Sequence, residues 1–352
     1  LLSTAYMPAQ VSPTLTAGYQ NALLLNYTAK LRENGHIVSL TTQRGVTLRA
    51  FIVDAAKKAF LERQKSTRKA VPKQAFDSTY VLDDPFYQSI DPNADHVYTI
   101  MVSPSPARHL LSTCRRISQS DFAFCKGSIA GNFFNRTAND ANHGVCHLVV
   151  GYVVGNENSD TWTIANEFTK EALPAYDERG QVDITDGSKG AKEATSVWEN
   201  VLPFQCSNHR MENAKNHGGK LARLQYQQAV HATTYIELQA LIAAFGDRLK
   251  HFVDAHSLES QFPAALLQKH NIFLHGTTTS NSSESVNHQA LVARSCNSEF
   301  HLLETMVQMC YTNFYKHRQQ MTNHMTNPSR SCPPAVFQEL RKLHNRAQQE
   351  HS

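Results

Sequence analysis

The chain has 352 residues, which is enough for about two typical domains or for one core with a large insertion. Hydrophobic residues make up 41% of the chain and charged residues 18%, which excludes a wholly disordered, collagenous or coiled-coil protein. The net charge of +4 is too small by itself to indicate a nucleic-acid partner. Residues 1–75, however, hold 11 Lys and Arg against 3 Asp and Glu, so the basic charge is concentrated near the N-terminus.

The cysteines and the hydropathy of the chain indicate its compartment. Seven cysteines, an odd number, are scattered through a chain large enough to fold without disulfides, which favours reduced thiols and an intracellular protein. No segment approaches the roughly 18 consecutive apolar residues of a membrane span, and the first residues lack the pattern of a signal peptide. The sequence therefore predicts no membrane partner.

A basic helical segment is predicted over 1–75. Apolar residues recur at helical spacing from Leu48 to Phe60, and basic residues occupy the other positions and continue to Lys73. This run fits contacts to DNA phosphates, and it also fits a solvated helix face or a nuclear-import signal. The side chains expected to bind DNA are Lys57, Lys58, Arg63, Lys65, Arg68, Lys69 and Lys73. Acidic residues and Pro over 76–96 predict a connector.

Strand and helix signals alternate after this connector. Apolar runs at 97–102 and 147–154 predict two strands. A helix is then expected to begin at Ser159 or Asp160, because either side chain can cap it, and Trp162 starts its apolar face. The chain from 97 onward is therefore predicted to be an α/β structure.

The second half of the chain is predicted to be mostly helical. A strand at 182–185 is expected to lead into a helix that continues through Trp198. Amphipathic stripes over 210–270 then predict a helical block. Another helix is expected from about Asn281, followed by a long one over 302–315.

Three carboxylates have distinctive surroundings. Asp186 follows the strand at 182–185, Glu284 lies near the start of a Ser- and Asn-rich helix, and Asp121 precedes a short aromatic stretch. Taken singly, such residues are usually helix caps, turn residues or solvent-facing helix residues. Phosphoryl transfer to DNA, however, needs hard oxygen ligands that hold two Mg²⁺ ions about 3.5–4 Å apart, and Asp and Glu supply these ligands.

Five segments, in this order, resemble the Mutator-like transposases. They are DFAFCKG at 121–127, VVGNEN at 153–158 followed by Trp162, ITDGSKG at 184–190, CSNH at 206–209 and TSNSSESVN at 279–287. The resemblance extends from about Asp95 to Gln320 and implies an RNase-H-like catalytic core with a DDE triad. It assigns Asp121, Asp186 and Glu284 to the triad and implies a helical insertion between the second and third carboxylates.

The resemblance implies both an architecture and an activity. The expected fold is an RNase-H-like mixed sheet flanked by helices, with an all-helical insertion and a basic helical N-terminal segment. The expected activity is cleavage of double-stranded DNA at element ends and strand transfer into a target, with two Mg²⁺ or Mn²⁺ ions. The protein is expected in the nucleus, and a homo-oligomer is possible. The predicted parts are 1–75, the connector 76–96, the first part of the core 97–205, the insertion 206–275, the closing helices 276–320 and a basic tail 321–352.

Two alternatives to an active transposase stay open at this point. The first is a catalytically inactive, domesticated derivative that binds DNA, and it is favoured by the polar run 115–120 before Asp121, where a buried central strand would normally be apolar. The second is an RNase-H-type nuclease, which would release hydrolysed rather than joined DNA. Metal titration separates an inactive protein from either enzyme.

Cys206 and His209 form a Cys-x₂-His pair, which is half of a zinc site by spacing. No second close pair follows at zinc-finger spacing, although His217 is a candidate partner. The sequence therefore predicts that the pair packs near the sheet edge and that zinc is absent. We also expect that His209 can approach the three carboxylates as a hydrogen-bond donor.

Overall fold

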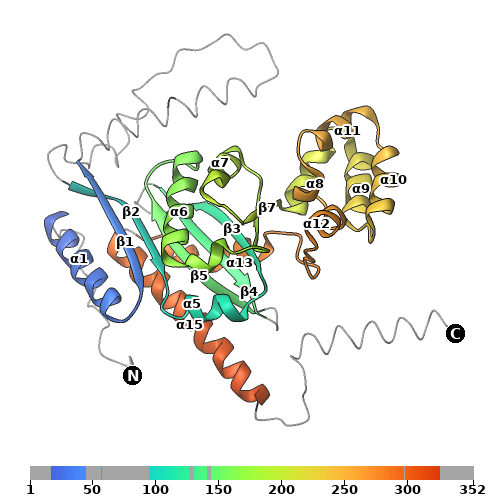
Figure 1. Cartoon of the computed structure of the whole chain (residues 1–352). Coiled ribbons are helices and arrows are strands. Elements are labelled where there is room, and N and C mark those ends of the chain that lie inside the picture. Colours follow the sequence, from blue (N-terminus) through green and yellow to red (C-terminus); the bar gives the residue numbers. More distant parts are fainter. Residues whose placement is uncertain are drawn as a thin grey trace.

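The computed structural model describes residues 17–44, 57, 95–126, 131–140, 144–296 and 298–325. These residues form an open seven-stranded mixed sheet with helices on both faces, so the predicted α/β class is confirmed (Figure 1). In the part of the chain that is described, no helix is both long enough and apolar enough to cross a membrane.

The strands run in the order β1-β2-β5-β4-β3-β6-β7 across the sheet. From β1 to β3 all neighbours are antiparallel, whereas β6 is parallel to β3 and β7 is parallel to β6. The strands are β1 (Ile37–Arg44), β2 (Asp95–Ser103), β3 (Ile117–Phe124), β4 (Asn132–Asn139), β5 (Val145–Val153), β6 (Val182–Thr185) and β7 (Leu202–Gln205). Three of them, β2, β5 and β6, are the strands that the sequence predicts.

Helices bury the two faces of the sheet in separate apolar clusters. One cluster joins α5 and α6 to the sheet through side chains that include Trp162, Phe134 and Phe168. The other joins α1, α13, α14 and α15 through side chains that include Leu303 and Met306. The helices are α1 (Ala17–Glu33), α5 (Ala107–Thr113), α6 (Ser159–Ala172), α7 (Lys189–Glu193), α13 (Asn281–Gln289), α14 (Leu291–Arg294) and α15 (Glu299–Met325).

The helical block predicted over 210–270 is present and has its own core. Aromatic and aliphatic side chains such as Tyr226, Leu238 and Phe262 are buried together within it. The block lies beyond the β7 edge of the sheet (Figure 1). Its helices are α8 (Ser207–Lys215), α9 (Gly219–Val230), α10 (Tyr235–Ala243), α11 (Asp247–Asp254) and α12 (Pro263–His270).

Two predicted helix ends differ from those in the structure. The cap of α6 is Asn158 rather than Ser159 or Asp160, because Asn158 Oδ1 accepts the Thr161 N–H at 3.0 Å and Thr161 Oγ1 accepts the Asn158 N–H at 3.0 Å. The helix predicted through Trp198 ends earlier, since α7 stops at Glu193 and a 3₁₀ helix spans Ala194–Val197. There the Thr195 hydroxyl donates to the Lys192 carbonyl and competes with the helical hydrogen bonds.

The N-terminal part of the chain differs from the predicted basic helical segment. Ile37–Arg44 is an edge strand that pairs with β2 along its whole length, and β2 begins at Asp95, inside the predicted connector. Val38 is buried in the same cluster as Leu24 and Leu31 of α1, so hydrophobic burial joins this part to the core. Lys57 is an exposed helical residue. The other predicted DNA-binding side chains, Lys58, Arg63, Lys65, Arg68, Lys69 and Lys73, and the tail 326–352 lie outside the described residues.

The polar run before Asp121 does form a buried central strand, β3, which the sequence does not predict. Its hydroxyl groups are paired, since Ser118 and Ser120 donate to Asp183 Oδ1 at 2.9 and 2.7 Å. The fully buried Arg136 on β4 completes the pairing, with Nη2 3.0 Å from Asp183 Oδ2 and Nε 2.8 Å from Ser120 Oγ. Because every charge and hydroxyl in this group has a partner, a polar sequence can occupy the centre of the sheet.

Candidate active site

The first two predicted carboxylates lie next to each other on neighbouring parallel strands. Gln119 of β3 pairs with Ile184 of β6, and continuing this register by two residues places Asp121 beside Asp186. Side chains alternate between the faces of a strand, so Asp121 and Asp186 project to the same face. A tight turn follows β6, where Gly187 has a φ of 77° and the Ser188 N–H donates to Asp186 Oδ1 at 2.8 Å. This turn fixes the carboxylate of Asp186.

The third carboxylate, Glu284, comes to this face on α13. Hydrogen bonds fasten the helix to β3, because the Ser282 N–H donates to Gln119 Oε1 at 2.7 Å and Asn287 Nδ2 donates to Asp121 Oδ2 at 2.7 Å. Ser280 Oγ donates to Glu284 Oε1 at 2.8 Å and orients the carboxylate. The three predicted residues are therefore brought to one place by β3, β6 and α13.

A fourth carboxylate, Glu157, joins the site from the loop between β5 and α6. Glu157 Oε1 accepts hydrogen bonds from Trp162 Nε1 and Ser188 Oγ, both at 2.9 Å. Burial raises the pKa of Glu157, as does the charge of Asp186, while the bond from Trp162 opposes this shift. The sequence reasoning missed Glu157, although its segment, VVGNEN followed by Trp162, is one of the five that resemble the transposases.

The mutual repulsion of these acids is clearest at Asp121. Burial, and then the charges of Asp186, Glu157 and Glu284, together raise the pKa of Asp121 to about 7, against the opposing charge of His209. An acid with a pKa near 7 beside several carboxylates indicates a site with surplus negative charge. Such a site is suited to divalent cations, which would relieve this repulsion and prefer carboxylate oxygens.

Cys206 and His209 border the acidic cluster. Cys206 is buried at the start of α8, and its sulfur accepts the Ser280 N–H at 3.3 Å. A hydrogen bond to Cys206, and then the charges of Cys206, Glu284 and Asp186, raise the pKa of His209 to about 9. Burial raises the pKa of the Cys206 thiol, but hydrogen bonds from His209 and Ser280 outweigh this effect and lower it overall. His209 is therefore an imidazolium at neutral pH.

His209 lies beside the third carboxylate, and its role as a hydrogen-bond donor stays a prediction. Its Nδ1 lies 3.9 Å from Glu284 Oε1, and the ligand atoms of Cys206, His209 and Glu284 lie within 4.8 Å of one another. Three such ligands can hold a metal ion, so the absence of zinc from this pair stays a prediction.

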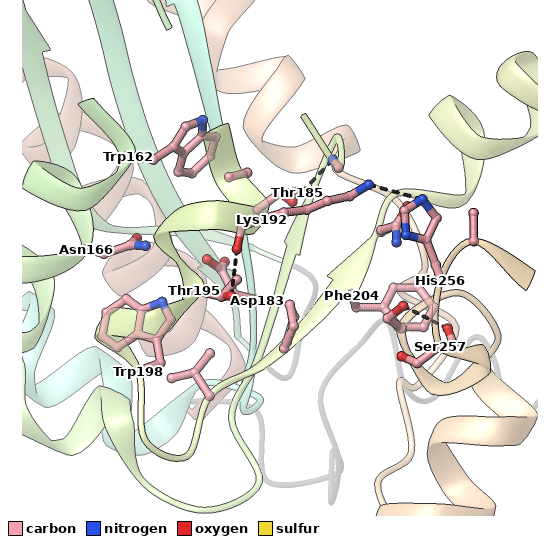
Figure 2. Close-up of a pocket in the computed structure, with 17 residues that line it drawn as sticks. Trp162, Asn166, Asp183, Thr185, Lys192, Thr195, Trp198, Phe204, His256 and Ser257 are labelled. Carbon is pink, nitrogen blue, oxygen red and sulfur yellow. Dashed lines mark hydrogen bonds between the residues drawn. The ribbon is translucent and has the colours of Figure 1, made fainter. Parts of the chain in front are cut away.

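A cavity of about 350 Å³ lies behind the Asp186 turn, between the sheet and the helical block (Figure 2). Trp162 and Trp198 line its core side, and Lys192 Nζ contacts His256 Nε2 at 3.1 Å across its mouth. Among the residues described, its lining includes none of the four carboxylates. Asp121 and Asp186 project from the opposite face of β3 and β6 from Asp183, so the acidic cluster is not part of this cavity.

No known protein-family model matches the chain, and no curated protein matches it. The functional conclusion therefore depends on the residues and on the geometry of the site.

Proposed function

We propose that the chain is a DDE-type transposase of the Mutator-like kind, which cleaves DNA at element ends and joins the freed 3′-hydroxyl to a target. The observation that carries the proposal is the convergence of Asp121, Asp186 and Glu284. These residues are far apart in the sequence and were selected from ordered motifs, and the charges of the other two raise the pKa of Asp121.

The sheet supports an RNase-H-like core within this proposal. Three antiparallel strands, β5, β4 and β3, are followed by the parallel strands β6 and β7. The first carboxylate lies on β3, the second follows the neighbouring strand β6, and the third lies on α13, which packs on β3 and β4. The helical block lies in the chain between the second and the third, where the resemblance implies an insertion.

The acidic residues fit a pair of Mg²⁺ or Mn²⁺ ions. Asp121, Asp186 and Glu284 would hold the metal, with Glu157 as a further carboxylate, and the metal would supply charge stabilisation for the attacking and leaving oxygens. Asn287 holds Asp121 and Ser280 holds Glu284, so both carboxylates are oriented before a metal binds.

DNA is the proposed substrate because divalent cations held by the acidic cluster would neutralise its charge and could then contact the phosphate oxygens of a DNA strand. The imidazolium of His209 places a positive charge next to Glu284, where it can contact a phosphate. The main phosphate contacts are assigned to the basic residues between 57 and 73, which gives the affinity a strong salt dependence. The protein would act in the nucleus.

The paired hydroxyl groups of β3 support an active enzyme over an inactive derivative. Ser118 and Ser120 donate hydrogen bonds to buried Asp183, and Ser120 accepts one from Arg136. The polar residues of β3 therefore have a structural role and do not indicate a decayed strand.

The test uses the full chain and a supercoiled plasmid that carries the chromosomal DNA flanking its gene on both sides. We expect Mg²⁺- or Mn²⁺-dependent cleavage and joined products with the unaltered protein, and neither with Asp186→Asn or Glu284→Gln. Asp254→Asn, an exposed change in the helical block, is the matched control and should leave both intact. Cleavage without joining would favour a plain nuclease, and cleavage retained by Asp186→Asn would refute the site.

A further inference from the structure

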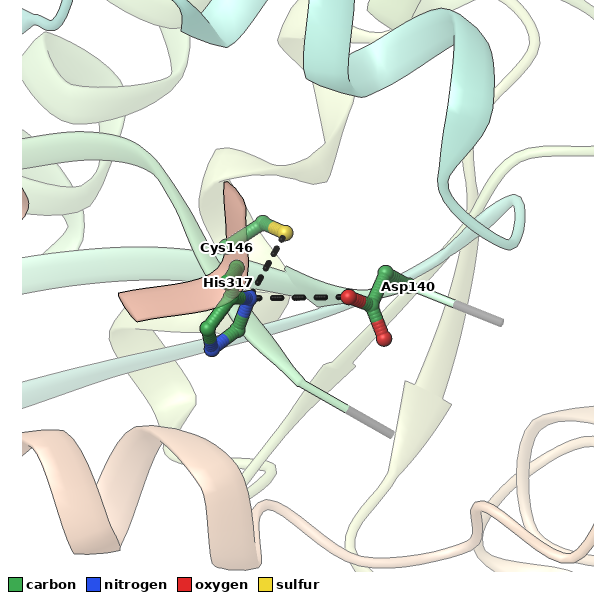
Figure 3. A group of neighbouring side chains, drawn as sticks. All are labelled: Asp140, Cys146 and His317. Carbon is green, nitrogen blue, oxygen red and sulfur yellow. Dashed lines mark hydrogen bonds and ion pairs between the residues drawn. The ribbon is translucent and has the colours of Figure 1, made fainter. Parts of the chain in front are cut away.

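A second group of side chains that could bind a metal ion lies apart from the four carboxylates. Asp140 follows β4, Cys146 lies on β5 and His317 lies on α15, and their side chains point toward one another (Figure 3). His317 Nδ1 is 3.5 Å from Asp140 Oδ2 and 4.0 Å from Cys146 Sγ. The ligand atoms of all three residues lie within 4.8 Å of one another.

Cys114 lies beside this group and is the nearest candidate for a fourth ligand. It is the residue that ends α5, and its thiol donates a hydrogen bond to the sulfur of Cys146. The four side chains thus come from α5, the end of β4, β5 and α15. A mixed set of two cysteines, one histidine and one aspartate is a donor set typical of zinc rather than of Mg²⁺ or Ca²⁺.

The backbone around the group is shaped to bring the ligands together. The Gly144 N–H donates to Asp140 Oδ1 at 2.7 Å and orients that carboxylate. A Cβ atom at Gly144 would lie 2.3 Å from His317 Cε1 and 2.8 Å from Asp140 Oδ2, so a larger residue would separate the two ligands. Only glycine therefore allows this close approach.

The distances are close to those of a tetrahedral zinc site. With bonds of about 2.0–2.1 Å to nitrogen and oxygen and about 2.3 Å to sulfur, a nitrogen ligand lies about 3.4 Å from an oxygen ligand and about 3.6 Å from a sulfur ligand. The observed separations from His317 Nδ1 are 3.5 Å to Asp140 and 4.0 Å to Cys146. These two separations are within about half an ångström of the tetrahedral values, whereas the Cys114 thiol lies outside the group within 4.8 Å and would have to move closer to complete the site.

We propose that Cys114, Asp140, Cys146 and His317 form a structural zinc site that fastens α15 to β4 and β5. Four protein ligands fill a tetrahedral coordination sphere, so the site would be closed and would not bind substrate. Because zinc binding to such a site is coupled to folding, the metal would hold the C-terminal half of α15 against the sheet. The proposal does not depend on the proposed transposase activity.

The test begins with elemental analysis of the untagged full chain purified under reducing conditions. We expect about one zinc ion per chain, and loss of that zinc with Cys146→Ser or His317→Ala. Cys206→Ser and Cys296→Ser are matched controls that should keep the bound zinc. Cys206→Ser also distinguishes this site from a zinc site at the Cys206–His209 pair. Cobalt in place of zinc should give thiolate-to-cobalt charge-transfer absorption that Cys146→Ser abolishes.

A second measurement needs no substitution, in case Cys146→Ser fails to fold. A strong chelator added to the unaltered protein should release the zinc and lower the melting temperature, and added zinc should restore it. The proposal is wrong if the unaltered protein holds no zinc after exposure to the metal, or if Cys206→Ser rather than Cys146→Ser removes it. A Cys114–Cys146 disulfide in the reduced preparation would also overturn it.

Discussion

Asp121→Asn should make the metal-free protein more stable at neutral and alkaline pH, although it removes a residue proposed to be essential. The Asp121 carboxyl is held among Asp186, Glu157 and Glu284, and its burial and their charges raise its pKa from 3.8 to about 7. The amide of the variant keeps the oxygen that accepts the Asn287 hydrogen bond, and it has no charge to repel. Residues placed for function rather than for stability often behave in this way.

The size and the sign of this stability difference follow from the linkage between proton binding at Asp121 and folding. Between pH 4 and pH 7 the native state binds more protons at Asp121 than the unfolded state does, so this residue's contribution to stability falls as the pH rises. A shift of about three units corresponds to at most about 4 kcal/mol. Asp121 is partly exposed, so solvent screening reduces this, and we expect about 2 kcal/mol at pH 8 and a small difference at pH 5.

Urea unfolding of both proteins between pH 5 and pH 8.5, with a chelator present, measures this difference. Asp254→Asn is the control, and as an exposed substitution it should change stability by no more than about 0.5 kcal/mol. Added Mg²⁺ should stabilise the unaltered protein and have less effect on Asp121→Asn. Equal or lower stability of Asp121→Asn at pH 8 would refute the electrostatic reasoning.

Three further predictions concern other parts of the molecule. Arg136→Met should destabilise the protein by about 3–5 kcal/mol, because buried Asp183 loses its partner, and adding Asp183→Asn should recover much of this in urea unfolding. Replacing the basic residues of 57–73 by Gln should reduce the slope of log affinity against log salt by about 0.9 per lost phosphate contact, measured by fluorescence anisotropy with duplex DNA. Cys206→Ser should move the pKa of His209 from about 9 towards 6.5, which an NMR titration of the imidazole measures.

Each of these predictions has a contrary result. Arg136→Met that costs under about 1 kcal/mol would mean that the buried pair contributes little to stability. An unchanged salt slope would mean that the basic run is a solvated face. An unchanged His209 titration would mean that the carboxylates rather than Cys206 raise the pKa of His209.

Hydrophobic periodicity in the sequence predicted the strands and helices that bury a continuous apolar face. The strands at 97–102, 147–154 and 182–185 are apolar, and the helical block has clear amphipathic stripes, so each was found from the sequence. Strand β3 was missed because three consecutive buried residues, Ser118, Gln119 and Ser120, are polar, and the partners of the two serines, Asp183 and Arg136, are distant in the sequence. Strand β1 was missed because its apolar residues are few and lie at one end.

The candidate site was predictable where a carboxylate lies in a distinctive local sequence. Asp121, Asp186 and Glu284 were selected in this way, whereas Glu157 has a role that only its contacts with Trp162 and Ser188 make visible. The Cys114, Asp140, Cys146 and His317 group could not be predicted, since its members are widely spaced and the close approach at Gly144 is a property of the folded chain.

Direct measurement of Mn²⁺ binding to the full chain tests the central claim, which is that the acidic cluster holds divalent metal. Electron paramagnetic resonance of the free ion during a titration gives the stoichiometry. We predict about two Mn²⁺ ions per chain for the unaltered protein, loss of this binding in Asp186→Asn and Glu284→Gln, and no change in Asp254→Asn. No Mn²⁺ binding by the unaltered protein, or equal binding by Asp186→Asn, would contradict the account.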